Sequence, residues 1–372
     1  MPLSAVDAIN PAFEHAKRQL FQPFRFGQWV RLAFVGLLAG ELGSSGGCNF
    51  GNGIHYPPSH SKGTTTDQWL GSGDGLPLPG HLGEHLGLLL AGILAFVVVA
   101  FIVGFLFLYV GSVMRFILFD SIIAKECHVR AGWARRKADG WRLFVWQMIL
   151  MLVTFAALVV LVLIPLGLAF ALGWLKQPKE HVLELILGGF LLLMIFLCLM
   201  LVLAVVHVMT KDFVVPQMAM EGISASEGWR RLWGRVKMEK GGYAGYLGMK
   251  LVLAIAAGIA FTIVILIAMV VLLIPVGAAG IATVLGAKAA GIAWNFYTIA
   301  LAAVIGLILL AVFFFVSALL STPLTVFFPA YSIYFFASRY PPLAALVWPQ
   351  PPVAPVPRFD PPPLHSTPAP LG

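Results

Sequence analysis

A short string of histidines and a glutamate carries the clearest catalytic pattern in this sequence. His81, Glu84 and His85 form an HxxEH motif, the order used by inverted zinc metallopeptidases. On a helix, the two imidazoles would bind zinc from adjacent turns and the carboxylate would act as general base. A third ligand would have to come from another loop, and neighbouring glycines weaken a helix here. We therefore expect a solvated helix start without a cofactor; an adventitious metal shared with His55 and His60 is the alternative.

The elements that must position these groups are membrane spans. Of the 372 residues, 60% are hydrophobic and 11% are charged, and the mean hydropathy is +0.92. A soluble chain has no interior large enough to hide so much apolar surface. Several apolar runs also exceed the roughly 18 to 20 residues that cross about 30 Å of hydrocarbon. The sequence therefore predicts an all-α, polytopic membrane protein.

Six spans and two flanking segments account for the chain. Residues 1–26 form an amphipathic N-terminal segment, 27–340 a membrane domain, and 341–372 a Pro-rich, disordered tail. The first span is short and basic at its start, so a secretory signal is the alternative for it. The predicted spans are residues 27–45, 86–114, 143–165, 182–209, 246–274 and 295–321.

The basic residues lie on one side of these spans. The segments before span one, after spans two and four, and after span six hold 20 of the 24 Lys and Arg when Arg31 and Lys250, at the inner ends of spans one and five, are included. Both termini are therefore predicted to be cytoplasmic, and Glu41, near the outer end of span one, to lie at the outer interface. Because the charges flank spans, the net charge of +8 indicates a bilayer partner and no nucleic acid.

Two stretches of the chain repeat. The strings LVLIPLGLA and VLLIPVGAA contain Pro165 and Pro275, and the basic segments upstream of them also align. The pattern predicts three hairpins, each entered from the cytoplasm, and therefore parallel repeats. The aligned upstream residues are Gly132, Trp133 and Arg135 in the first segment and Gly228, Trp229 and Arg231 in the second.

The basic segments between spans are predicted to be interfacial helices. Ser224 and Glu227 have capping-box spacing, and the following residues form an apolar stripe with a basic opposite face. Such helices suit the anionic headgroups of the cytoplasmic leaflet; capping the bundle is the alternative, and protein partners stay unknown. The predicted interfacial residues are Trp133, Arg135, Trp229, Arg230, Arg231, Trp233 and Arg235.

Prolines and charges near the span ends favour structural roles. Pro165 lies about 36 Å along a helix from Trp141, so we expect it to end a span at the outer interface. Asp120 is expected to pair with Arg115 or with a basic residue of a neighbouring helix. No ionisable residue falls mid-span, which disfavours ion-coupled transport. The predicted helix breaks are Pro165, Pro275, Pro216 and Pro329.

Two strings carry a resemblance. DFVVPQMAMEGISASEGWRRLW after span four and FGQWVRLAF at span one, with the six-span layout, resemble uncharacterised bacterial multi-pass proteins. These are related to the membrane domain found beside glycerophosphodiester phosphodiesterases. The resemblance implies a fold for residues 10–340 and no catalytic residue, because no phosphodiesterase domain is present.

Function is predicted only by class. The leading hypothesis is a non-enzymatic protein of a bacterial cytoplasmic membrane that acts as a scaffold or handles lipid-like molecules. The second is a permease for an apolar or amphipathic solute, which a pathway lined by Ser, Thr and Gly would favour. The third is a membrane metalloenzyme that uses the external histidines.

Overall fold

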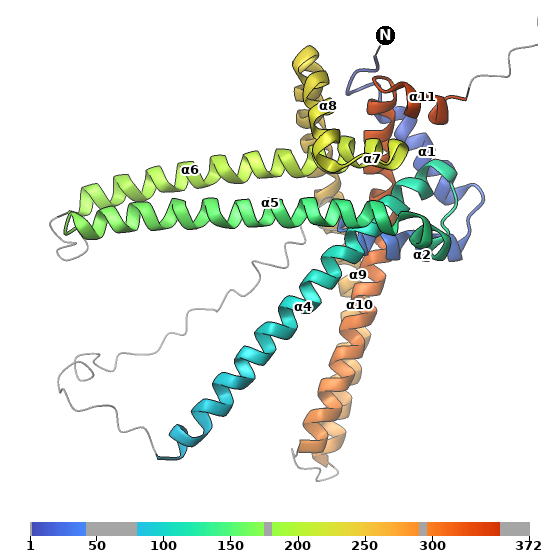
Figure 1. Ribbon diagram of the computed structural model, residues 1–372. Coiled ribbons are helices and arrows are strands. Elements are labelled where there is room, and N and C mark those ends of the chain that lie inside the picture. The colour runs from blue at the N-terminus through green and yellow to red at the C-terminus, as the bar shows by residue number, and fades with distance from the viewer. Residues whose placement is uncertain (1, 42–79, 175–180, 290–295, 350–372) are drawn as a thin grey trace, which may run out of the picture.

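Helices make up all the regular structure in the part of the chain that the structure describes. The computed structural model describes residues 2–41, 80–174, 181–289 and 296–349 (Figure 1). The predicted all-α class is confirmed for these ranges. The elements are α1 (Ile9–Phe21), α2 (Phe26–Leu38), α4 (Gly80–Ala124), α5 (Val129–Ala171), α6 (Val182–Met209), the π-helix η2 (Thr210–Val214), α7 (Val215–Glu221), α8 (Ala225–Met238), α9 (Lys240–Ala289), α10 (Phe296–Ala337) and α11 (Pro341–Val347).

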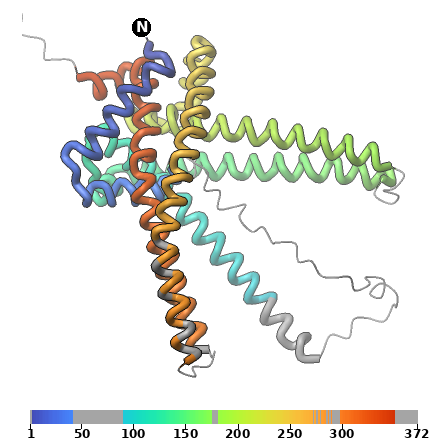
Figure 2. Tube along the Cα trace, turned by 180° about the vertical axis from the view of Figure 1, so that it is seen from behind, coloured from blue at the N-terminus to red at the C-terminus, as the bar shows by residue number. Residues whose placement is uncertain are grey.

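The helices radiate from one buried cluster of side chains, which we call the hub. It is built by α1, α2, the ends of α4 and α10, the starts of α5 and α9, and the short elements η2, α7, α8 and α11. Three arms leave it: α4, the α5–α6 pair and the α9–α10 pair (Figures 1 and 2). Because α1 and α11 both pack on the hub, the two ends of the described chain lie at the same place.

Five of the described helical stretches are long and apolar enough to cross a membrane. Their most apolar windows have mean hydropathies of 2.9 to 3.2, and none of these windows is buried by the rest of the chain. Side chains of this kind, left uncovered on the arms, require lipid as their solvent. The chain is a multi-pass helical membrane protein. The five stretches are Leu90–Ala124, Val129–Ala171, Val182–Glu221, Lys240–Val271 and Thr298–Ala337.

The predicted first span, 27–45, is seen as a shorter helix. α2 has 13 residues, about 20 Å at 1.5 Å per residue, which is less than the hydrocarbon thickness. Gly40 takes a left-handed conformation (φ 77°), which only glycine adopts easily, and turns the chain after α2. Residues 42–45 lie outside the described residues, so a sixth span stays a prediction.

Each of the other five predicted spans overlaps a long apolar helix, and most of these helices extend beyond the predicted interval. The span 182–209 coincides with α6, but α5 starts at Val129 and α9 at Lys240. The segment with Trp133 and Arg135 was predicted as a separate interfacial helix and is instead the beginning of α5. The reason is that no proline interrupts the segment, and Gly140 is tolerated inside a long helix.

The helix breaks predicted at Pro165 and Pro275 are wrong. α5 continues through Pro165 to Ala171, and α9 continues past position 275 to Ala289. Ending a helix in or near hydrocarbon exposes several backbone groups, whereas one proline removes a single hydrogen bond. Pro329 likewise lies within α10. At Pro216 the chain does change helix type, from η2 to α7.

Glycines let the basic segments lie against the ends of earlier helices. A Cβ atom at Gly132 would lie 3.0 Å from Ile117 of α4, and one at Gly228 would lie 2.8 Å from Val214 of η2. Both distances are shorter than ordinary contacts. The Gly-Trp pairs read in the sequence therefore sit where helices approach closely, which turns Trp133 and Trp229 toward the hub core.

Candidate functional site

A π-helix brings two charges into the centre of the hub. All five residues of η2 are buried. Val215 donates its backbone N–H to the carbonyl of Thr210, five residues back, and Pro216 has no N–H for the carbonyl of Asp212. The chain widens into a π turn at this point, a geometry that is frequent at functional sites. The turn directs Lys211 and Asp212 into the protein interior.

Two ion pairs meet around η2. Lys211 pairs with Glu41, which follows α2, and Asp212 pairs with Lys250 of α9. The hydroxyl of Tyr246 also donates to Asp212 at 2.9 Å. Glu41 is 1% exposed and Asp212 is 2% exposed. The prediction that Glu41 lies at the outer interface is therefore corrected: the short α2 turns back within the hub, where the carboxylate meets a buried lysine.

Arg115 of α4 is the third cation of this cluster. Its Nη2 donates to the carbonyl of Ala39 at 3.2 Å. Its Nε is buried and has no hydrogen-bond partner among the described residues. The cluster of Glu41, Arg115, Lys211, Asp212 and Lys250 thus holds three cations and two anions. Charged residues that lie far apart in the sequence thus converge in space, and their positions along the chain do not predict this contact.

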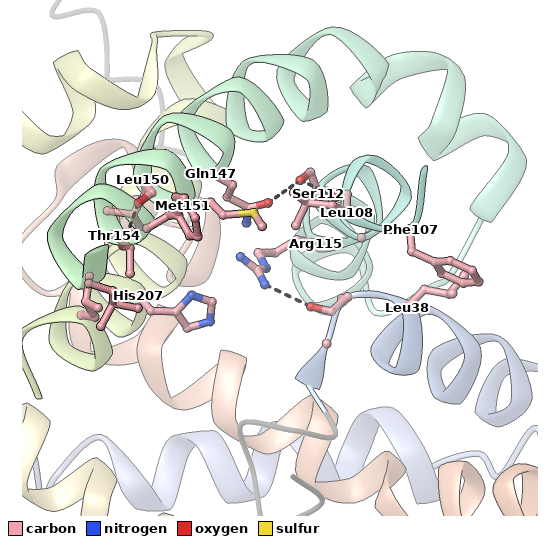
Figure 3. A pocket seen from close by; sticks show the side chains of 16 residues that line it. Leu38, Phe107, Leu108, Ser112, Arg115, Gln147, Leu150, Met151, Thr154 and His207 are labelled. Carbon is pink, nitrogen blue, oxygen red and sulfur yellow. Dashed lines mark hydrogen bonds between the residues drawn. The ribbon is translucent and has the colours of Figure 1, made fainter. Parts of the chain in front are cut away.

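A cavity of about 610 Å³ opens beside Arg115, between α2, α4, α5 and α6. We call it the hub pocket, and its volume is in the range of small-molecule sites. Figure 3 shows the Arg115 guanidinium directed into it, with His207 on the opposite wall. Its lining residues are Leu38, Ala39, Gly40, Phe107, Leu108, Gly111, Ser112, Arg115, Gln147, Leu150, Met151, Thr154, Phe155, Leu158, Leu203 and His207.

Few polar groups interrupt the apolar lining, and most already have partners. Ser112 donates its hydroxyl to Gln147 Oε1 at 2.8 Å, and Thr154 donates to the carbonyl of Leu150 at 2.7 Å (Figure 3). These contacts satisfy the hydroxyl groups of Ser112 and Thr154 within the protein. A molecule in the pocket would therefore meet an apolar wall along most of its length and a cation at one end.

The comparisons with known proteins place the chain in a family. Residues 3–346 match the model of a family of unknown function, DUF7544. The chain belongs to this family. No curated protein and no solved structure matches it. The DUF7544 match provides no link to the membrane domain found beside glycerophosphodiester phosphodiesterases, so that resemblance stays a prediction.

The basic helix α8 of this DUF7544 chain packs largely on its own protein. Ser224 accepts a hydrogen bond from the N–H of Glu227, which confirms the predicted cap. The indole of Trp229 donates to Thr210 Oγ1 at 3.0 Å and Leu232 is fully buried. Trp233, in contrast, is 55% exposed. The apolar stripe therefore meets the hub on one edge and is open on the other.

The charged residues of α8 also fall into two groups, one in contact with the hub and one exposed. Arg231 pairs with Glu221 and Glu227, and the Arg235 guanidinium lies 4.7 Å from the centre of the Tyr340 ring. Hydrogen bonds from Arg231 and Arg230 lower the pKa of the Glu227 carboxyl. Arg230 is 78% exposed in its side chain. A headgroup role for Trp133, Arg135 and the α8 residues stays a prediction.

Asp120 forms its predicted ion pair with Arg136, a basic residue of the neighbouring helix. Arg136 Nε and Nη2 each lie 2.8 Å from an Asp120 carboxylate oxygen, and Nη1 donates to the carbonyl of Ala219 at 2.8 Å. Asp139 contacts the same guanidinium at 3.2 Å. The second of the two predicted partners for Asp120, a basic residue of the neighbouring helix, is thus the observed one.

The HxxEH motif lies in the first turns of α4, and its side chains are outside the described residues. Within the described ranges, no group of three or more His, Cys, Asp or Glu is arranged to hold a metal ion. The predicted lack of metal at His81 and His85 therefore stays a prediction.

Proposed function

We propose that the protein is a non-enzymatic, lipid-handling membrane protein that holds the apolar part of a lipid-like molecule in the hub pocket. The observation that carries this proposal is the pocket itself: an apolar cavity of about 610 Å³ that lies among membrane-spanning helices. Acyl chains are the solvent of those helices, so they are the molecules most available to fill it.

The dimensions of the pocket suit a chain-shaped ligand. On α4 its lining extends from Arg115 to Phe107, and on α5 from Gln147 to Leu158. At 1.5 Å per residue these stretches are about 12 and 16 Å long. The pocket therefore extends from the charged cluster along the spans, and its depth is comparable to half of a hydrocarbon core.

Occlusion of the pocket tests the proposal. Met151 lines the cavity, whereas its neighbour Leu152 does not. Both side chains are exposed on α5, so they differ mainly in this position. Met151→Trp should reduce the lipid that stays bound to the purified protein, measured by native mass spectrometry, by at least about half. Leu152→Trp is the matched control and should retain it. Equal lipid retention in both variants would contradict the proposal.

A permease is the second candidate, favoured by small and hydroxylated residues in the lining: Gly40, Gly111, Ser112 and Thr154. Such residues leave space for a moving solute. Flux into liposomes distinguishes the two functions, because a binding protein should release a labelled amphiphile only to the leaflet from which it came. Transfer across the bilayer that Met151→Trp abolishes would favour the permease.

The proposed topology has six spans in three parallel hairpins, with both termini in the cytoplasm of a bacterial cell. α4 begins at Gly80 far from the hub and α10 ends at it (Figure 1). Five crossings are an odd number, so they place the start of α4 on the side of the membrane opposite the hub. α1, however, packs on the hub. Both ends lie on one side of the membrane only if one further crossing precedes α4. A cysteine at Ser61 should react with an impermeant reagent in intact cells; reaction only after lysis would contradict this topology.

A further inference from the structure

We infer that the hub pocket selects an anionic amphiphile, with a carboxylate or phosphate head at Arg115 and its acyl chain between α4 and α5. The inference rests on the proposed lipid-handling function and names its ligand class. Three observations carry it: the unused hydrogen-bonding capacity of Arg115, the charge balance of the cluster around η2, and the polarity gradient along the cavity.

Arg115 retains donors for a ligand. A guanidinium has five N–H donors, and among the described residues this one donates only to the Ala39 carbonyl. Its Nε is buried without a partner, a state that is unfavourable until an acceptor arrives. Figure 3 shows the group directed toward the cavity. Planar, paired donors of this kind bind carboxylate and phosphate oxygens in a bidentate manner.

The carboxylates of Glu41 and Asp212 attract Arg115, but each of them also contacts a lysine. Glu41 is paired with Lys211, and Asp212 with Lys250 and Tyr246. Each acidic residue of the cluster is thus engaged with a lysine, and one positive charge remains in excess. Because an unbalanced charge near hydrocarbon is unfavourable, an anion in the pocket would stabilise the protein as well as bind to it.

The polarity of the lining fixes the orientation of the ligand. Arg115 immediately follows the predicted span 86–114, whereas Leu108 and Phe107 lie within it. On α5, Gln147 precedes the apolar Leu150 and Met151 in the same direction. The head therefore belongs at the hub end and the chain points toward the bilayer centre, as in a lipid of the leaflet next to the hub.

Competition in nanodiscs of phosphatidylcholine tests this selectivity with the full chain. The probe is a diazirine-bearing laurate, whose crosslinks should map to α4 and α5 near Leu108 and Met151. The competitors are laurate, dodecyl phosphate and monolauroylglycerol, with acetate and inorganic phosphate as chain-free anions. Laurate and dodecyl phosphate should compete at least about tenfold better than monolauroylglycerol, and the chain-free anions should not compete at similar concentrations.

Two variants separate the role of Arg115 from its contribution to folding. Arg115→Gln should remove the preference for anionic competitors, while Arg115→Lys keeps part of it. Gln147→Glu leaves Arg115 in place and adds a negative charge to the lining, so it should weaken the two anionic competitors and spare monolauroylglycerol. If Arg115→Gln does not fold, Gln147→Glu alone decides the question.

The outcomes distinguish this inference from the proposed function. Equal competition by the neutral and anionic compounds, all blocked by Met151→Trp, would overturn anion selection and leave lipid binding intact. Crosslinks that no competitor reduces and that Met151→Trp does not change would overturn both. Preference retained in Arg115→Gln, or competition by inorganic phosphate alone, would assign the anion to another site or to a chain-free ligand, and either result would contradict the inference.

Discussion

The indole nitrogen of Trp29 donates to the backbone carbonyl of Leu319 at 2.9 Å. In an unbroken helix this carbonyl would accept from residue 323, but that residue is Pro323, which has no N–H. A side chain of α2 thus satisfies the carbonyl that a proline leaves open in α10, 290 residues away. The contact connects α2 to α10.

Replacing Trp29 should therefore lower the stability of the protein. The size of this loss should depend on whether residue 323 is proline. We expect Trp29→Phe to lower the free energy of unfolding by about 1 to 2 kcal/mol, because a partly buried carbonyl loses its donor. In a Pro323→Ala background the helix supplies an N–H, so the same substitution should have a smaller effect. Unfolding in mild detergent measures both. An equal effect in the two backgrounds would attribute the loss to packing of Trp29 against Phe21 and Phe24.

Gly140 is predicted to be essential for the contact between α4 and α5. A Cβ atom there would lie 2.4 Å from Val113 Cγ2 and 2.9 Å from its Cα. Since the backbone of Val113 cannot give way like a flexible side chain, we expect Gly140→Ala to destabilise the protein by about 1 to 3 kcal/mol. Thermal unfolding of the purified protein provides the measurement.

Gly234 is the matched control for this substitution. It lies within α8, and a Cβ atom there would have no neighbour within 4 Å among the described residues. Gly234→Ala should therefore stabilise the helix slightly, by about 0.5 to 1 kcal/mol. If both substitutions changed stability in the same direction, the close approach of Gly140 to Val113 would not explain the effect of Gly140→Ala.

The five long apolar helices were predictable because hydropathy is a local property, whereas the ends of a helix depend on its neighbours. The interval 182–209 coincides with α6, but nothing local distinguishes a separate interfacial helix from the first turns of α5. The Ser224 cap was predictable, since its partner lies three residues away. The ion pair of Glu41 with Lys211 joins residues 170 positions apart, and no sequence periodicity encodes such a contact.

His15 is expected to make the stability of the hub depend on pH. Its Nε2 donates to the Ile122 carbonyl at 3.0 Å, and in the neutral ring its Nδ1 accepts from the Tyr334 hydroxyl at 3.2 Å. Burial, reinforced by the charges of Lys125 and Arg18, lowers the pKa of His15 below 6.5. The folded state therefore disfavours the protonated ring, and this contribution to stability is complete above pH 6.5 and declines as the pH falls below it.

Substitution of His15 should flatten that part of the pH profile. We expect the wild-type midpoint of thermal unfolding to fall between pH 7 and pH 5.5, and His15→Gln to show a smaller slope over the same interval. His128 is a suitable control because its side chain is 67% exposed; His128→Gln should keep the wild-type slope. A slope unchanged by His15→Gln would assign the dependence to other groups.

The open edge of α8 is where the structure leaves room for the predicted headgroup contact. Trp229 and Leu232 face the hub, so Trp229→Phe should reduce stability through its lost bond to Thr210 and change lipid binding little. Trp233 is exposed, and Lys237 lies 5.9 Å from its ring. Trp233→Phe should therefore remove most of the fluorescence quenching that brominated lipids cause in α8, without loss of stability.

The positive charge beside Trp233 should make its contact with the bilayer stronger when the lipids are anionic. Arg230 and Lys237 are exposed beside it, and each basic residue near an anionic leaflet contributes about 1 kcal/mol. The Trp233-dependent quenching should then be stronger in nanodiscs with phosphatidylglycerol than with phosphatidylcholine, and high salt should reduce it. Arg230→Gln with Lys237→Gln should abolish the difference between the lipids. If quenching were equal in both lipids, the basic face would serve topology alone; if it were absent from both, α8 would face the cytoplasm and be open to a protein partner.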